Sequence, residues 1–190
     1  YVEFGDLVFT NNGISGPVVL TLSSYLGGLK TNDIDLSLDW KPALSADELY
    51  QRIIRERDKG PTRLFQTLLE TLLPKSMVPV FADQINIGLR TPINELTKAN
   101  QEDLVRLLKS FPLTYKSLGE FKQAVVTQGG VDVREINPSS MESKIQKGLY
   151  FAGEVIDIDA LTGGYNLQLA FSTGYLAGLS AAVDNTKELE

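Results

Sequence analysis

The chain contains no cysteine and no histidine among its 190 residues. Without cysteine it can form no disulfide, no thiolate nucleophile and no redox-active dithiol. Without histidine it lacks a Ser-His-Asp triad, a histidine zinc site and an imidazole acid or base. Any chemistry must therefore come from a cofactor or from residues outside this sequence. We expect no metal site, and the sequence identifies no catalytic residue.

Long hydrophobic runs and dense basic clusters are also missing. No apolar run approaches the ~20 residues that cross a bilayer, and the first residues lack the basic-then-apolar pattern of a signal peptide. The net charge is −6, with 18 Lys and Arg against 24 Asp and Glu. No Lys/Arg cluster is dense enough to favour a phosphate backbone. We expect a cytoplasmic protein that binds neither membrane nor nucleic acid.

The first 42 residues carry strand signals around one short helix. Residues 7–10 form an apolar run that ends at a turn, and residues 34–40 alternate apolar and polar side chains as a half-buried strand does. Between them Pro17 opens a helix, with a strand as the alternative because Val18 and Val19 are β-branched. So few strands form no stable sheet alone, and the chain starts at Tyr1 rather than Met. We expect a fragment of a longer protein.

Residues 43–112 have a helical pattern. The spacing of Ser45 and Glu48 is a capping box, in which the serine hydroxyl accepts a backbone N–H and the glutamate reaches back to the cap. Leucine-rich stripes predict that these helices bury a core of their own. The expected helices are 45–60, 64–73, 76–87 and 101–110, the last capped by Asn100.

After residue 112 the pattern returns to strands and ends in a helix. We predict neighbouring strands at 124–127, 131–136 and 149–152, with a helix from about Tyr165. Spacing alone favours a hairpin turn at Gly129–Gly130. The helix repeats small residues every four positions, so we expect it to pack closely on the strands and to tolerate no large side chain there. These small residues are Ala170, Gly174 and Gly178.

A loop with three carboxylates joins the last predicted strand to the helix. Glu154, Asp157 and Asp159 lie between Gly153 and the Gly163–Gly164 pair. A strand, a glycine-rich loop and a helix start together present backbone N–H groups to a ligand oxygen. The alternative is a flexible turn before a helix cap, because glycine-rich turns are common.

The resemblance of the chain to a known family is strongest in two segments. They are 153–174, with Gly153-Glu154-Val155, Thr162 to Gln168 and Ser172-Thr173-Gly174, and 126–131, Val-Thr-Gln-Gly-Gly-Val. They are similar to the BaiN-like/YhiN-like bacterial flavoproteins, NAD(P)/FAD-dependent oxidoreductases with a domain inserted in the flavin-binding fold. The resemblance implies an α+β fold. Residues 1–125 would be the inserted domain, with a β-sheet or barrel part at 1–42 and a helical part at 43–112, and 126–190 the C-terminal strands and helix of a Rossmann-like FAD-binding domain.

The same resemblance implies FAD as cofactor and NAD(P)H as a possible reductant. Glu154 would accept hydrogen bonds from the ribityl chain, and Gly129 and Gly130 would let the backbone approach the flavin. No GxGxxG follows a strand in this sequence, so the partner holding the FAD pyrophosphate would be the missing N-terminal half. We expect the 190-residue chain to purify colourless. The remaining residues implied at the cofactor are Gly153, Asp157, Gly163, Gly164, Tyr165, Asn166 and Leu167.

Two other interpretations stay open at this point. The chain could be a stand-alone α+β binding module whose glycine-rich segments are structural turns. It could also be a hydrolase in which Asp157 and Asp159 hold a metal, although two acidic residues without further ligands are more often a solvated loop. The sequence does not specify a substrate, which the oxidoreductase interpretation expects to be a small molecule.

Overall fold

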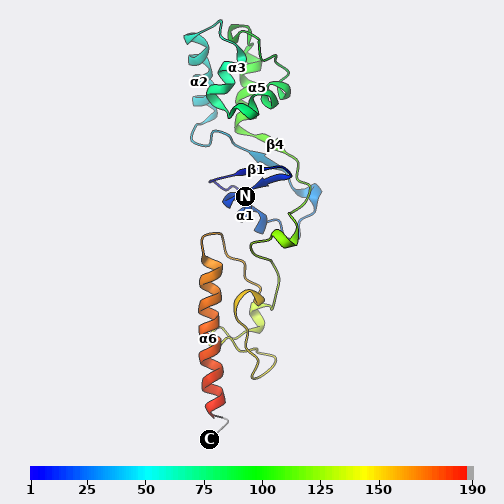
Figure 1. The fold of residues 1–190 in the computed structure, drawn as a ribbon, viewed down its shortest axis with the longest axis vertical. Helices are drawn as coiled ribbons and strands as arrows, with labels where there is room; N and C mark the ends of the chain where they lie inside the picture. The colour runs from blue at the N-terminus through cyan, green and yellow to red at the C-terminus, as the bar shows by residue number, and fades with distance from the viewer. Residues whose placement is uncertain (188–190) are drawn as a thin grey trace. The chain divides into compact units, whose positions relative to one another are not determined.

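The computed structural model describes residues 1–187 and confirms a mixed α+β fold. The described residues contain six α-helices and two two-stranded antiparallel sheets. They divide into two compact units (Figure 1). The helical unit is Lys30–Lys116, and the terminal unit combines Tyr1–Leu29 with the chain from Ser117 onward. The expected domain division at residues 125 and 126 stays a prediction.

The helical unit is built around a leucine-rich core. The capping box of α2 forms as predicted, because the Glu48 N–H donates to Ser45 Oγ at 3.2 Å and the Ser45 N–H donates to Glu48 Oε2 at 2.8 Å. Leu49, Phe65 and Leu108 are fully buried, each on a different helix. The elements are η1 (Thr31–Asp33), β3 (Leu36–Leu38), α2 (Ala46–Lys59), α3 (Phe65–Leu72), η2 (Lys75–Met77), α4 (Val78–Gln84), η3 (Ile93–Glu95), α5 (Lys98–Lys109) and β4 (Phe111–Leu113).

Two helix predictions in this unit need correction. The last helix begins three residues earlier than expected, with Thr97 rather than Asn100 as its N-cap. Asn100 is instead the third helical residue, and its side chain accepts the Thr97 N–H at 3.0 Å. The predicted helix 76–87 is a 3₁₀ turn followed by α4, and Pro79 lies in the first turn of α4, where a missing N–H breaks no helix bond.

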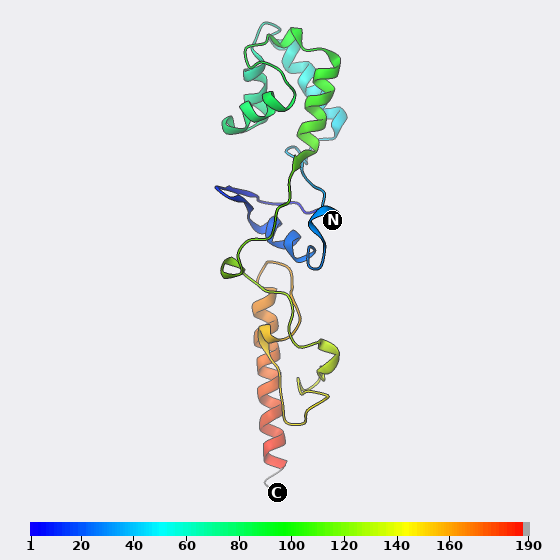
Figure 2. The ribbon, with the colours of Figure 1, turned by 90° about the vertical axis from the view of Figure 1, so that its right-hand side faces the viewer.

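The terminal unit begins with a hairpin and a short helix. Strands β1 (Val8–Thr10) and β2 (Gly13–Ser15) pair antiparallel, with Phe9 opposite Ile14. Helix α1 (Pro17–Ser24) follows and has proline in its first turn, as predicted. The later elements are η4 (Phe121–Gln123), η5 (Val133–Glu135), η6 (Gly153–Val155) and the long helix α6 (Tyr165–Lys187), which is uninterrupted in Figure 2.

The three strands predicted at 124–127, 131–136 and 149–152 are wrong. Among the described residues these segments make only isolated bridges, such as Val131 with Ile156 in parallel and Glu142 with Tyr150 antiparallel. A strand needs a paired neighbour along its whole length, and none of the described segments supplies one. The chain instead turns through η5 and η6 and forms a small core under α6, in which Ile136, Ile156 and Ala177 are buried.

The predicted packing face of α6 is wrong at two of its three residues. A side chain added at Gly174 or Gly178 would meet no atom within 4 Å, and both glycines are exposed. The packed face carries the half-buried Thr173 and the buried Ala177, and of the three predicted residues only the half-buried Ala170, 3.9 Å from a Cβ placed on Gly153, lies on it. The expected contacts depended on strands that do not form, so the helix packs on loop residues with a partly different face.

Candidate cofactor site

Two of the predicted site segments meet through backbone hydrogen bonds. The Val131 N–H donates to the Val155 carbonyl at 2.8 Å, and the Asp157 N–H donates to the Val131 carbonyl at 3.0 Å. These bonds hold residues 127–130 beside residues 153–159. Together with residues 160–167 we call these segments the loop cluster. The structure therefore brings together predicted site residues that are 24 or more positions apart in the chain.

Each carboxylate of the loop cluster accepts a hydrogen bond from the segment 127–129. The Thr127 N–H donates to Glu154 Oε1 at 3.2 Å, and the Gly129 N–H donates to Asp157 Oδ1 at 3.1 Å. The Gln128 side-chain amide donates to Asp159 Oδ2 at 2.9 Å. The three acidic residues thus fix the glycine loop in place, and each still has a second carboxylate oxygen with acceptor capacity.

Glycine is favoured at two positions of this loop, Gly129 and Gly130, for different structural reasons. A Cβ at Gly130 would lie 2.4 Å from the Val155 carbonyl oxygen and 2.9 Å from the Asp157 nitrogen. Gly130 is therefore required by the chain's own backbone. Gly129 has open space around it, and only its φ of +99° disfavours a side chain. A ligand could approach the backbone at Gly129 but not at the face of Gly130 that Val155 covers.

The start of α6 forms the other side of the loop cluster. Gly163 and Gly164 have φ of +132° and +89°, and no atom lies within 4 Å of a Cβ position on Gly164. The Gln168 N–H donates to the Gly164 carbonyl at 3.0 Å, which makes this the first bond of the helix. The N–H groups of Tyr165, Asn166 and Leu167 have no partner within the helix, and such groups attract electron-rich ligand atoms.

Asn166 and Thr173 hold this turn together through their side chains. The Asn166 amide donates to the Ala160 carbonyl and accepts the Ala160 N–H, both at 2.8 Å. Thr173 Oγ1 accepts the Gly153 N–H at 3.0 Å from the first turns of α6. These bonds fix the path of the loop between its two glycine ends. Thr173 was within the quoted motif, but its pairing with Gly153 gave no signal in the sequence.

Sequence reasoning also missed the residues that connect the loop cluster to α1. The Gln128 side chain donates to the Ser24 carbonyl as well as to Asp159, and its oxygen fills the space beside Gly27. The hydroxyls of Thr21 and Thr162 lie 2.9 Å apart, and Thr21 is buried. Gln128 lay inside a quoted motif, whereas nothing in the sequence paired Thr21 with a residue 141 positions away.

One carboxylate beside the loop cluster has a shifted pKa. The Arg134 side chain and backbone N–H both donate to Asp132 and lower the pKa of this carboxyl to about 2. Asp132 caps the turn η5 in this way. Among the side chains that the structure describes, no group of three or more Asp and Glu residues is placed to hold a metal ion. Within residues 1–187 no helix is both long and apolar enough to cross a membrane.

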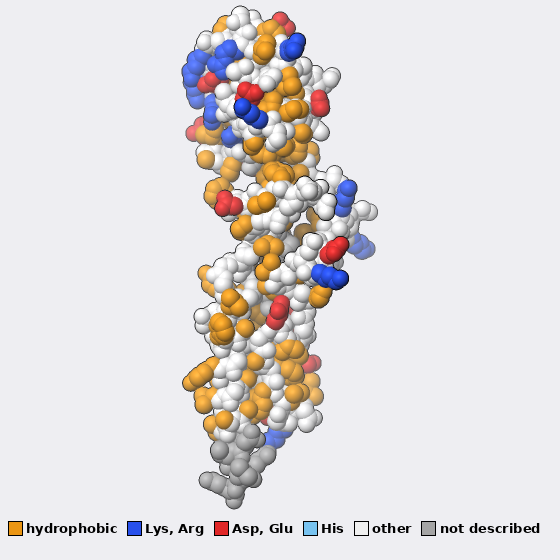
Figure 3. All heavy atoms as spheres, in the orientation of Figure 1, with side chains coloured by type: hydrophobic (Ala, Val, Ile, Leu, Met, Phe, Trp, Pro, Cys, Tyr) orange, Lys and Arg blue, Asp and Glu red, His pale blue; other side chains and the backbone are white. Residues whose placement is uncertain are grey.

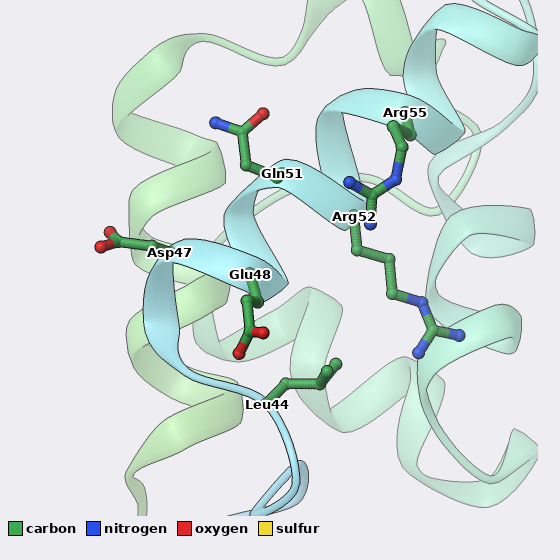
Figure 4. Close-up of a pocket in the computed structure, with 6 residues that line it drawn as sticks. All are labelled: Leu44, Asp47, Glu48, Gln51, Arg52 and Arg55. Carbon is green, nitrogen blue, oxygen red and sulfur yellow. The ribbon is translucent and has the colours of Figure 1, made fainter.

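Two hollows accompany these features, one in each unit. An apolar hollow of about 200 Å³ lies in the terminal unit between Ile136, Met141, Ile156 and Thr173. A larger one of about 460 Å³ lies at the start of α2 in the helical unit (Figure 4). Its lining includes Arg52 and Arg55, but none of the predicted cofactor residues.

Comparison with known proteins gives the chain a family. The family described as "HI0933-like protein barrel and H2TH domain" matches residues 1–126. The chain is 35% identical over 182 residues to a "3-dehydro-bile acid delta(4,6)-reductase" of Clostridium scindens, covering 95% of this chain and 44% of that protein. It is 34% identical over 177 residues to a "Ribosomal RNA dihydrouridine synthase" of Haemophilus influenzae, covering 93% and 42%.

A third relative is the "Ribosomal RNA dihydrouridine synthase" of Escherichia coli, 31% identical over 170 residues, with 90% of this chain and 40% of that protein covered. The chain thus spans less than half the length of the curated relatives that it matches. The resemblance to BaiN-like/YhiN-like flavoproteins is confirmed by these matches. The chain belongs to the HI0933-like protein family.

Proposed function

We propose that the chain is part of an FAD-dependent oxidoreductase and that its loop cluster contacts the flavin and ribityl end of the cofactor. The observation that carries this proposal is the meeting of the glycine loop 127–130, the acidic loop 153–159 and the start of α6. The names of the relatives support an oxidoreductase-type enzyme for the intact protein. When bound, the flavin would supply two-electron transfer, for which this chain has no group of its own.

The residues present fit such a cofactor at three points. The N–H groups of Tyr165 and Leu167 would donate hydrogen bonds to the carbonyl edge of the flavin ring. Such donors at a helix N-terminus stabilise negative charge on that edge. The open space at Gly164 would let the ring approach the backbone. The second carboxylate oxygen of Glu154 would accept hydrogen bonds from the ribityl hydroxyls, while Oε1 keeps its hydrogen bond from the Thr127 N–H. Asp157 and Gly129 would hold the loop in position rather than touch the reacting atoms.

The rest of the FAD site would come from the part of the protein outside these residues. The pyrophosphate needs a glycine-rich turn after a strand, a motif that this sequence lacks. NAD(P)H is the proposed reductant. The names of the relatives suggest a substrate whose carbon–carbon double bond is reduced, and we propose a small molecule of this class first.

The experiment is to express the intact protein and measure flavin absorbance after gel filtration. We expect a yellow protein whose flavin is released as FAD on denaturation. Adding NADH or NADPH without oxygen should bleach the visible band. Loss of flavin on purification without rebinding of added FAD would reject the proposed cofactor.

RNA is a second candidate substrate, because two of the relatives are named as ribosomal RNA dihydrouridine synthases and the helical unit is the less acidic part of the chain. The helical unit holds 13 of the 18 basic residues but 12 of the 24 acidic ones, so its formal charge is +1 and the rest of the chain carries −7. Figure 3 shows Lys and Arg side chains gathered over α2. Among them, Arg55 is exposed and forms no ion pair with a described residue. Neutralised phosphates would make such binding depend on salt.

This candidate is tested by binding of a labelled ribosomal RNA fragment to the intact protein at several salt concentrations. Specific binding that weakens in Arg52→Gln/Arg55→Gln would favour RNA. The matched control is Lys98→Gln/Arg106→Gln, which removes two exposed cations of α5. Equal weakening in both pairs, or no binding, would leave the small-molecule substrate as the proposal.

A further inference from the structure

The residue that helix α1 buries most deeply is polar. Among the described residues of α1 only Thr21 is buried, at 9% exposed, and its apolar neighbours on the helix are half-buried. A short helix normally buries apolar side chains, because a buried hydroxyl needs a hydrogen-bond partner. Valine would fill the same volume without this requirement. Packing alone therefore does not explain a threonine at this position.

The partner of Thr21 lies 141 positions away in the chain. The hydroxyl oxygens of Thr21 and Thr162 are 2.9 Å apart, so one hydroxyl donates to the other. Thr162 is exposed and directly precedes the Gly163–Gly164 pair at the start of α6. A buried hydroxyl of α1 thus holds an exposed residue of the loop cluster.

The turn before α6 needs a fixed point outside itself. The Gly163–Gly164 pair has positive φ, and glycine has the widest choice of backbone conformations. The hydrogen bonds between Asn166 and Ala160 close the turn on itself, because both residues belong to it. The pair of Thr21 and Thr162 instead ties the turn to another element. This pair therefore helps to determine where the first N–H groups of α6 lie.

The end of α1 also holds the acidic loop. The Gln128 side-chain amide donates to the Ser24 carbonyl of α1 and, at 2.9 Å, to Asp159 Oδ2. The two sides of the loop cluster are thus attached to one short helix, at Thr21 and at Ser24. A shift of the turn at Thr162 would change its place relative to the acidic loop.

We propose that Thr21 is a positioning residue of the cofactor site, which holds the start of α6 where its N–H groups stabilise negative charge on the flavin edge. This inference rests on the proposed function. Thr21 is not among the residues proposed to contact the flavin, so it acts through Thr162. The field of a helix terminus falls off within its first turn, so a small displacement of that turn changes the stabilisation. The Thr21 hydroxyl would therefore influence the midpoint potential of the flavin.

Packing is the competing explanation for Thr21. If the residue only fills space, Thr21→Val should be tolerated, and Thr21→Ser, which loses the methyl group, should be the more disruptive change. If the hydroxyl positions the turn, this order is reversed. Ser23→Ala is the matched control, because the Ser23 hydroxyl lies on the same helix but donates to the Leu20 carbonyl within it.

The first measurement is hydrogen exchange of residues 160–168 in the intact protein with its flavin removed. This segment contains the Ala160 and Gln168 amides, which donate to the Asn166 side chain and the Gly164 carbonyl. We expect about tenfold faster exchange in Thr21→Val, as for the loss of one hydrogen bond. Thr21→Ser and Ser23→Ala should exchange at the rate of the unmodified protein.

The second measurement is the midpoint potential of the flavin in the same variants. In Thr21→Val the preference for reduced over oxidised flavin should fall about tenfold, which lowers the potential by about 30 mV for two electrons. Thr21→Ser should keep the unmodified potential. Thr162→Val removes the other hydroxyl of the pair and should cause the same shifts, so it replaces Thr21→Val if that variant does not fold.

The proposal would be overturned by unchanged exchange in Thr21→Val, or by a larger disturbance in Thr21→Ser. Faster exchange in Thr21→Val with an unchanged potential would also overturn it, because Thr21 would then hold the turn without positioning the cofactor. An unmodified protein that binds no flavin would reject the proposed function and this inference together. Bound flavin of equal potential in all variants would reject this inference alone.

Discussion

Gly130 lies so close to Val155 that a Cβ on the glycine would be 2.4 Å from the Val155 carbonyl oxygen. The same contact places the Val131 N–H 2.8 Å from that oxygen. A glycine that resembles a cofactor-binding position in sequence thus has a packing role within the chain. It holds the glycine loop against the acidic loop and so determines where the proposed flavin contacts lie.

Gly130→Ala is expected to loosen the loop cluster, because the added methyl group meets backbone atoms at a φ of +145°. The local cost should exceed ~2 kcal/mol. Gly129→Ala is the matched control, with a φ of +99° but open space, and should cost only about 1 kcal/mol. Hydrogen exchange of the Asp157 amide, which donates to the Val131 carbonyl, measures the difference. Equal protection of the Asp157 amide from exchange in the two variants would contradict the close contact between Gly130 and Val155.

Gly174→Leu should leave the stability of the 190-residue chain unchanged or raise it by up to ~1 kcal/mol, since leucine favours helix more than glycine does. This reverses the expectation from the sequence, because nothing lies within 4 Å of the position. Ala177→Leu, on the buried face, should cost about 1–3 kcal/mol through overpacking. Urea unfolding followed by circular dichroism compares them. A large loss of stability for Gly174→Leu, without one for Ala177→Leu, would instead support the packing face predicted from the sequence.

Thr97→Ala should destabilise the helical unit by about 1 kcal/mol, because it removes the hydroxyl that accepts the Asn100 N–H at 3.1 Å. Asn100→Ala keeps that hydroxyl and should cost less than half as much. The fluorescence of Trp40, which contacts the rings of Phe81 and Phe111, reports unfolding of this unit. The opposite order of the two losses would make Asn100 the cap.

The Asp132 carboxyl should titrate near pH 2 in an NMR experiment, because Arg134 lowers its pKa from 3.8 to about 2. A folded-state pKa below the unfolded one means that the interaction stabilises the protein above pH 3.8. That stabilisation is lost as the pH falls toward 2. In Arg134→Gln the midpoint should rise toward 3.8, whereas Lys122→Gln should not move it. A titration midpoint of Asp132 near pH 3.8 in the unmodified chain would contradict the interaction between Asp132 and Arg134.

The helical unit was largely predictable from sequence, and the terminal unit was not. Capping residues such as Ser45 and the leucine periodicity act over a few positions, so they specify α2 and α3 locally. Strand formation at 124–127 and 149–152 depends on partners far along the chain, and the described residues supply only isolated bridges. The pairing of Thr21 with Thr162 could not be predicted for the same reason, because the two residues lie far apart in the chain.

The candidate site was predicted residue by residue from motifs, but its internal contacts were not. Nothing in the sequence indicated that Glu154 and Asp157 each accept a backbone N–H from the glycine loop. The face of α6 was misassigned because small residues at four-residue spacing fit close packing equally well whether or not a neighbour is present. Only the burial of Ala177 and the exposure of Gly174 distinguish the two faces.

The central claim is that the loop cluster binds the flavin end of FAD, and flavin occupancy of the intact protein tests it most directly. Visible absorbance after gel filtration should show a bound flavin in the unmodified protein and reduced occupancy in Gly164→Val, because a β-branched side chain fills the open approach at a φ of +89°. Glu154→Ala should also bind FAD more weakly, while Gln146→Ala, at a surface turn outside the cluster, should retain it. The 190-residue chain should be colourless. An intact protein without flavin, or full occupancy in folded Gly164→Val and Glu154→Ala, would contradict the assignment.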